Sequence, residues 1–142
     1  MNREVRQTGT MMTPPESRIF LHPDGYVEMV FVGMQETERL ETLIARARAL
    51  IDEHGPISVV VDGRNGRIQP NINNFSHLMS LGRIPNLIQL YILTSDDPNN
   101  SEAIQGPSVV TSILTSVLGF RPFYSSDEAD IRHRASEDKR KT

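Results

Sequence analysis

Ile57-Ser58-Val59-Val60-Val61-Asp62-Gly63-Arg64-Asn65-Gly66 is the stretch that decides the fold. Its first half is a nearly unbroken β-branched run, which is typical of a strand buried on both faces of a sheet. Gly55 and Pro56 precede the run and Gly63 follows it, so the sequence predicts a central strand over residues 57–62. A polar loop rich in glycine and asparagine is predicted over residues 62–74.

Asp62 is predicted to lie at the carboxyl end of this strand. In open α/β sheets, ligands and partners gather outside such strand ends, which makes this carboxylate a candidate binding group. The alternative is that Asp62 braces its own turn, because aspartate before glycine is ordinary turn chemistry. The sequence alone leaves both interpretations open.

The composition excludes several classes of protein. The chain has 142 residues and a formal net charge of −3, which fits one domain and provides no cationic field for nucleic acid. It contains no cysteine, so disulfides, thiol catalysis and cysteine-based zinc sites are excluded. No apolar run approaches the roughly 20 residues that cross a bilayer. We therefore expect a cytoplasmic protein with no membrane insertion, no cofactor and no metal.

The chain divides into a leader, one domain and a tail. Residues 1–17 are polar and predict a flexible leader. A single domain is predicted over residues 18–136, and residues 137–142 are predicted to be a charged tail that frays. The domain opens with apolar runs at 18–22 and 26–32, joined by Pro23-Asp24-Gly25, which predicts an antiparallel β-hairpin. An apolar stripe at helical spacing then predicts a long helix that ends at Gly55.

Alternating elements are predicted over the rest of the domain. Asn73 or Asn74 is expected to cap a short helix, and residues 87–94 to form a second buried strand before a polar loop over 95–107. A four-residue apolar rhythm predicts a helix over 108–119, followed by a brief strand and a last helix with a capping box at Ser125-Ser126-Asp127-Glu128. The predicted fold class is α/β, with a mixed, mostly parallel sheet, an N-terminal β-hairpin and flanking helices.

This order of elements resembles the STAS domain, a family that includes anti-sigma-factor antagonists and stand-alone STAS-like proteins. The resemblance covers roughly residues 18–136, with Phe123 in the brief strand and a last helix opening on Ser126-Asp127-Glu128-Ala129. It implies a non-enzymatic regulatory module that binds a kinase-type protein partner and is switched by phosphorylation. The family's acceptor lies in an Asp-Ser-Ser/Thr-Gly motif, where this chain has Asn71-Ile72-Asn73-Asn74, so the switch does not carry over. Ser76, nearby, is the candidate for phosphorylation.

A second resemblance is to the receiver domain of response regulators. Val59-Val60-Val61-Asp62 is similar to its phosphoacceptor strand, and Leu90-Tyr91-Ile92-Leu93-Thr94 is similar to its threonine strand. A receiver also needs an acidic pair after its first strand to hold magnesium, whereas this chain has Gly33-Met34-Gln35 there. This alternative is a degenerate receiver-like signalling domain centred on Asp62.

The candidate binding site lies where the two polar loops leave neighbouring strands. Loops of this length are uncommon unless they bind or are disordered, so we predict that they form one polar rim that binds a protein partner. No nucleophile, base and orienting group are suitably spaced, and the chain is therefore not expected to be an enzyme. The predicted rim residues are Asp62, Arg64, Asn65, Arg67, Ser95, Asp96 and Asp97.

The predicted helix over residues 108–119 carries no charge. A smooth, uncharged face suits close docking of another surface. A further alternative is therefore a self-associating structural or assembly protein that forms a homodimer. The hydroxyl residues of this predicted interface are Ser108, Thr111, Ser112, Thr115 and Ser116.

Overall fold

A computed structural model describes residues 16–107, 112, 115, 116 and 121–141 of the chain. It contains a five-stranded sheet in the order β1-β2-β3-β4-β5. β1 pairs antiparallel with β2, and the remaining neighbours pair in parallel. The α/β class and the antiparallel hairpin are thus confirmed. The strands are β1 Arg18–His22, β2 Tyr26–Gln35, β3 Ile57–Ile68, β4 Leu87–Leu93 and β5 Phe123–Ser125.

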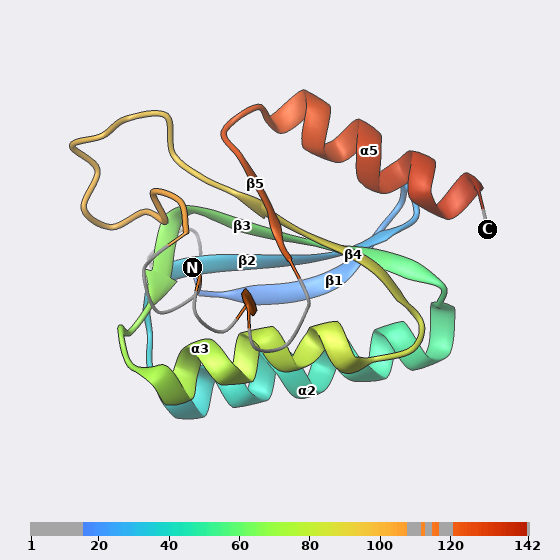
Figure 1. The fold of residues 1–142 in the computed structure, drawn as a ribbon, viewed down its shortest axis with the longest axis horizontal. Helices are drawn as coiled ribbons and strands as arrows, with labels where there is room; N and C mark the ends of the chain where they lie inside the picture. The colour runs from blue at the N-terminus through green and yellow to red at the C-terminus, as the bar shows by residue number, and fades with distance from the viewer. Residues whose placement is uncertain (1–15, 108–111, 113–114, 117–120, 142) are drawn as a thin grey trace, which may run out of the picture.

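Helices cover both faces of the sheet (Figure 1). α2 (Thr37–His54) and α3 (Ile72–Met79) lie on one face, and the short 3-10 helix η1 (Ser80–Arg83) continues α3. α5 (Glu128–Arg140) lies on the other face. The helix predicted over 108–119 lies largely outside the described residues; 112, 115 and 116 are helical. None of the described helices has the length and apolar character needed to cross a membrane.

The central strand serves two hydrophobic cores, one on each face of the sheet. Val59 and Val61 belong to the larger core under α2 and α3, whereas Val60 belongs to the smaller core under α5. In the smaller core, Val60 is clustered with Tyr91 and Ile131. Because successive side chains of a strand point to opposite faces, the unbroken apolar run of β3 is what a strand between two cores requires.

β3 is longer than the sequence predicts. It continues through Asp62 to Ile68, so the loop predicted over residues 62–74 is wrong for 62–68. The extension forms because β2 also continues to Gln35, which pairs with Ile68. The β2–β3 register shifts after Val30, which leaves two residues of β3 opposite one of β2, as in a β-bulge. Glycine and asparagine in this segment therefore mark a bulged strand.

The helix starts also differ from the predictions. Asn71, and not Asn73 or Asn74, caps α3, because its side chain accepts a hydrogen bond from the Asn74 amide at 2.8 Å. Asp127 caps α5 through the Asp130 amide at 3.1 Å, in place of the capping box predicted from Ser125. Residues 137–140, which the sequence assigns to a charged tail, form the last turn of α5. The predicted leader lies outside the described residues except for 16 and 17.

Candidate functional site

A polar cavity of about 490 Å³ lies where β4 and β5 end beside the bulge of β3. Its walls come from the bulge of β3, the loop after β4 and the start of α5. Four of the seven predicted rim residues line this cavity, so the structure brings together residues from both predicted loops. The lining residues are Arg64, Asn65, Thr94, Ser95, Asp96, Asn100, Ser126 and Glu128.

The loop after β4 folds back onto the bulge of β3. The Ile104 amide donates to the Gly63 carbonyl at 2.7 Å, and the Asn100 side-chain amide donates to the Arg64 carbonyl at 3.2 Å. Gly63 permits this approach, since an added Cβ would lie 2.5 Å from Ile104 Cδ1. Backbone hydrogen bonds thus fix one wall of the cavity to the sheet.

Asp62 is held by Arg64, a residue that lines the cavity. The Arg64 side chain donates from Nε to Asp62 Oδ1 at 3.0 Å and from Nη2 to Oδ2 at 2.9 Å. The Arg64 backbone amide also donates to Oδ1 at 3.1 Å. Asp62 is only 6% exposed and is absent from the cavity lining. The structure therefore supports the interpretation in which Asp62 braces its own stretch of chain.

The Asp62–Arg64 pair continues into a chain of charges that joins β2, β3 and α5. Arg64 Nη1 donates to Glu128 Oε1 at 2.6 Å, and Arg132 Nε donates to Glu128 Oε2 at 2.8 Å. Arg132 also donates to the Glu28 carboxylate and, at 2.9 Å, to the Tyr26 hydroxyl. Paired, hydrogen-bonded charges of this kind are tolerated at partly buried positions, and here they attach α5 to the sheet.

The pKa values of these groups follow from the pairing. Burial alone would raise the pKa of Asp62, but hydrogen bonds from the Arg64 side chain and backbone, together with its charge, hold that pKa below its ordinary value. Hydrogen bonds from Arg132 and Arg64 lower the pKa of Glu128. The hydrogen bond to Asp62 raises the pKa of Arg64. All of these groups are therefore charged at neutral pH.

Arg67 and Asp97 lie away from the polar cavity. Arg67 lines a separate, largely apolar cavity of about 220 Å³ together with Phe75 and Ile104. Asp97 stabilises a turn of the loop, because its Oδ1 accepts the Asn99 amide at 2.9 Å. The sequence predicts two arginines, Arg64 and Arg67, at the polar rim, whereas only Arg64 is among the described residues that line the polar cavity.

Sequence reasoning missed four of the lining residues, namely Thr94, Asn100, Ser126 and Glu128. The sequence offers one signal for Thr94, because it is the last residue of the strand predicted over 87–94. In the structure β4 ends at Leu93, which pairs with Asp62, so Thr94 lies next to the bulge of β3. The sequence predicts Glu128 only as part of a helix cap. A local capping pattern does not indicate that the Glu128 carboxylate contacts Arg64, which lies far away in the chain.

The other predicted sites are only partly described. Ser76 lies exposed on α3. Of the predicted self-association residues, Ser112 and Ser116 are exposed and Thr115 is half-buried. Ser108 and Thr111 lie outside the described residues. Within the described ranges, no three His, Asp or Glu side chains gather as a metal-binding group.

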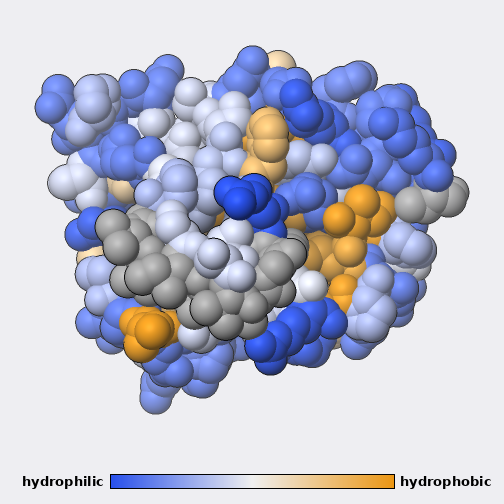
Figure 2. All heavy atoms as spheres, viewed as in Figure 1, coloured by the Kyte–Doolittle hydropathy of each residue, from blue (hydrophilic) through white to orange (hydrophobic). Residues whose placement is uncertain are grey.

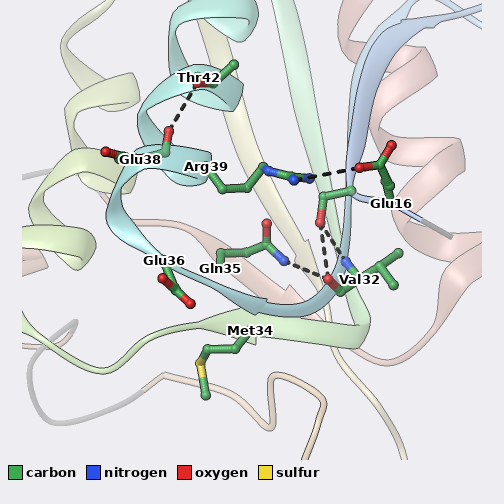
Figure 3. A pocket seen from close by; sticks show the side chains of 9 residues that line it. Glu16, Val32, Met34, Gln35, Glu36, Glu38, Arg39 and Thr42 are labelled. Carbon is green, nitrogen blue, oxygen red and sulfur yellow. Dashed lines mark hydrogen bonds and ion pairs between the residues drawn. The ribbon is translucent and has the colours of Figure 1, made fainter. Parts of the chain in front are cut away.

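A second cavity, of about 540 Å³, lies at the start of α2 (Figure 3). Arg39 approaches Glu16 to 3.7 Å across it, and Glu36 and Glu38 also line it. Figure 3 shows the Gln35 side-chain amide turned toward Val32, whose carbonyl it meets at 3.0 Å. Its wall at Glu16 adjoins residues outside the described part of the chain, so we assign this cavity no function.

The face of the molecule shown in Figure 2 is mostly hydrophilic outside the grey residues, and its hydrophobic areas are small and separate. The large apolar side chains that are exposed in the described residues are Leu21, Met34 and Ile72, which lie on three different elements. Such single exposed residues are normal, and the polar cavity remains the better candidate for a binding site.

The fold and the cavity define an α/β domain with a mixed five-stranded sheet and a polar hollow beyond the ends of its parallel strands. No family model, no curated protein and no solved structure matches the chain.

Proposed function

We propose that this chain is a non-enzymatic, regulatory protein-binding module of the STAS-like type. In this proposal a protein partner docks over the polar cavity, where β4 and β5 end beside the bulge of β3. The observation that carries the proposal is the cavity itself: two segments distant in sequence and the start of α5 converge there, at the edge where open α/β sheets bind their ligands.

The sheet supports the STAS-like part of this proposal. The resemblance implies a hairpin followed by a mostly parallel sheet with helices, and the described strands have that arrangement. At the position of the family's phosphoacceptor, Asn71 caps α3. Asn74 is fully buried there; it accepts from the Thr37 hydroxyl at 2.8 Å and donates to the Gln69 carbonyl at 3.1 Å. Structural asparagines thus stand where the family carries its switch.

The chemistry of the cavity favours binding over catalysis. Its hydroxyl groups come from Thr94, Ser95 and Ser126, and no hydrogen bond among the described residues joins one of them to a carboxylate, histidine or lysine that could act as its base. The receiver-like alternative is also disfavoured, because both oxygens of Asp62 are engaged by Arg64. A phosphoacceptor must instead present a free oxygen to its donor.

The test is to block the cavity without touching the charge network. Asn65 lines the cavity, is exposed and forms no hydrogen bond or ion pair with the described residues of that network, so Asn65→Trp should fill the opening while the domain stays folded. Arg48→Trp, on the exposed side of α2, is the matched control. Tagged wild type and both variants, with melting temperatures checked by circular dichroism, would be used to capture proteins from extract of the source organism.

We expect at least one protein to be captured by wild type and by Arg48→Trp but not by Asn65→Trp. Equal capture by all three chains would show that partners dock elsewhere. An absence of any specifically captured protein would contradict the protein-binding function itself.

A further inference from the structure

Two polar groups at the polar cavity have no side-chain partner among the described residues. Thr94 is only 7% exposed, yet no other described residue hydrogen-bonds its hydroxyl. Among the described side-chain atoms, only Gln35 Oε1 is both fully enclosed and unpaired, so the Thr94 hydroxyl stays open to the cavity that its residue lines. Asp96, on the same wall, is exposed and forms no ion pair with a described residue. The Thr94 hydroxyl and the Asp96 carboxylate are therefore both accessible to a ligand that enters this cavity.

The positive charge at this cavity is already compensated. Among the described lining residues Arg64 carries the only guanidinium, and it is bound by both Asp62 and Glu128. An anionic ligand could reach only the N–H groups of Arg64 that these carboxylates leave open, and it would be repelled by the carboxylates of Asp62, Glu128 and Asp96 around the same cavity. The cavity therefore disfavours an anion, although it contains an arginine.

The start of α5 does not alter this balance. A helix N-terminus attracts anions through its free amides and its dipole. Here the Asp127 side chain already accepts the Asp130 amide, and Glu128 and Asp130 place two more carboxylates in the first turn. The partial positive charge of the helix is therefore offset by the chain's own acids.

We propose that the polar cavity binds a cationic side chain, a lysine ammonium or an arginine guanidinium, presented by the partner protein. This inference rests on the proposed function and specifies the chemistry of the partner. Asp96 supplies the counter-charge, and the Thr94 hydroxyl oxygen supplies an acceptor at the base of the site. Ammonium and guanidinium groups carry several donors and no acceptor, which complements the oxygens of Thr94 and Asp96.

The probe is n-butylammonium, which mimics a lysine side chain. It is titrated into the ¹⁵N-labelled full-length chain at constant ionic strength, with sodium butyrate and n-butanol as controls of equal length. We expect saturable shifts of the Thr94, Ser95 and Ser126 amide signals with n-butylammonium alone. The shifts should weaken as sodium chloride is added, because a partly exposed ion pair is screened. Stronger binding of butyrate, or equal effects of all three probes, would overturn the proposal.

Two variants locate the contact. Asp96→Asn removes the charge and keeps the shape, and we expect it to weaken n-butylammonium binding by about fivefold, as for one partly exposed ion pair. Thr94→Val removes the hydroxyl at constant volume and should weaken binding as well. Asp97→Asn is the control, because it changes the net charge equally from outside the lining. An equal loss with Asp97→Asn would show that only the general field attracts the probe and would overturn the site.

The outcomes separate this inference from the proposed function. If Asn65→Trp abolishes partner capture but n-butylammonium does not bind, the partner docks at the cavity through other chemistry and the cation proposal fails. If n-butylammonium binds and Asn65→Trp leaves capture unchanged, the cation site stands and the proposed docking function fails. If Asp96→Asn no longer captures the partner protein and Asp97→Asn still does, the result supports both the cation site and the proposed docking function.

Discussion

Single glycines determine how closely the backbones of this fold approach one another. A Cβ at Gly66 would lie 2.5 Å from the Phe31 carbonyl carbon, which belongs to the backbone of β2, whereas a Cβ at Gly33 would meet nothing within 4 Å. Gly33 instead has φ +73°, which costs alanine about 1–2 kcal/mol. We expect Gly66→Ala to lower the free energy of unfolding, measured with urea, by more than Gly33→Ala does. Equal losses would show that β2 and β3 separate without penalty.

Asp62 also permits a prediction at the residue scale. Its two oxygens receive three hydrogen bonds from Arg64, so neither is free to attack a phosphoryl donor. We expect incubation with acetyl phosphate and magnesium to leave the intact mass of the protein unchanged, while a receiver domain in the same reaction gains a phosphate. A base-labile phosphate that maps to Asp62, and that Asp62→Asn abolishes, would revive the receiver-like alternative.

For single residues, the sequence predicted which of them lie at the cavity better than it predicted their side-chain contacts. It placed Arg64, Asn65, Ser95 and Asp96 around one edge of the sheet, and they line one cavity. The position of a residue near a strand end follows from its sequence neighbours. The return of Arg64 onto Asp62 depends on the bulge, and its contact with Glu128 depends on how α5 docks. Neither is a local property of the chain.

Among elements, α5 is unusual in how it docks on the sheet. Its buried residues are Ile131 and Ala135, a small apolar surface for a helix of this length. Polar contacts supply the rest: Asp138 Oδ2 accepts from the Tyr91 hydroxyl at 2.6 Å and from the Ser58 hydroxyl at 2.8 Å. Burial and this hydrogen bond raise the pKa of Tyr91. Asp138 therefore satisfies two hydroxyl groups at once.

Removing this carboxylate should be costly. Ser58 is fully buried, so Asp138→Ala leaves at least one buried hydroxyl unpaired, at a cost of about 1–3 kcal/mol. We expect a loss of that size in the free energy of unfolding from urea denaturation, whereas Lys141→Ala, at an exposed position, should stay within about 0.5 kcal/mol. An unchanged midpoint for Asp138→Ala would mean that the end of α5 contributes nothing to stability.

The elements themselves were predictable where apolar periodicity is strong. The hairpin, α2 and the start of β3 follow from such patterns. The end of α5 was missed because its sequence is almost wholly charged, and charged ends usually fray. Its partners, Ser58 and Tyr91, lie on strands far away in the chain. The extension of β3 was missed because glycine and asparagine disfavour strands locally, while pairing with β2 overrides that preference.

For the whole molecule, self-association through residues 108–119 stays a prediction. Ser112 and Ser116 are both helical and exposed, and residues four apart share one face of a helix. We expect Ser112→Lys with Ser116→Lys to convert a dimer to a monomer in sedimentation velocity, with the melting temperature nearly unchanged. Identical sedimentation of the wild type and the double variant would remove the idea.

The charge chain makes the stability of the whole molecule depend on pH. The folded-state pKa values of Asp62 and Glu128 lie below their ordinary values, which are about 4 for carboxyl groups. Such groups bind fewer protons in the folded state than in the unfolded state. Their contribution to the free energy of unfolding is therefore present at neutral pH and is lost as the pH falls from about 5 through the folded-state pKa. We therefore expect the wild-type melting temperature to fall on acidification.

Arg64→Met tests the origin of that fall. Without the guanidinium, the buried Asp62 carboxylate keeps only the hydrogen bond from the backbone amide of residue 64 and has lost its counter-charge, so the variant should melt well below wild type at pH 7. Acidification neutralises Asp62 in both proteins, and the difference between their melting temperatures should therefore narrow between pH 7 and pH 3. Arg67→Met is the matched control, since Arg67 is exposed and forms no ion pair with a described residue; it should follow wild type throughout. A constant difference between Arg64→Met and wild type would show that Arg64 acts by packing alone, because a contribution from its charge must disappear when the carboxylates that face it are protonated.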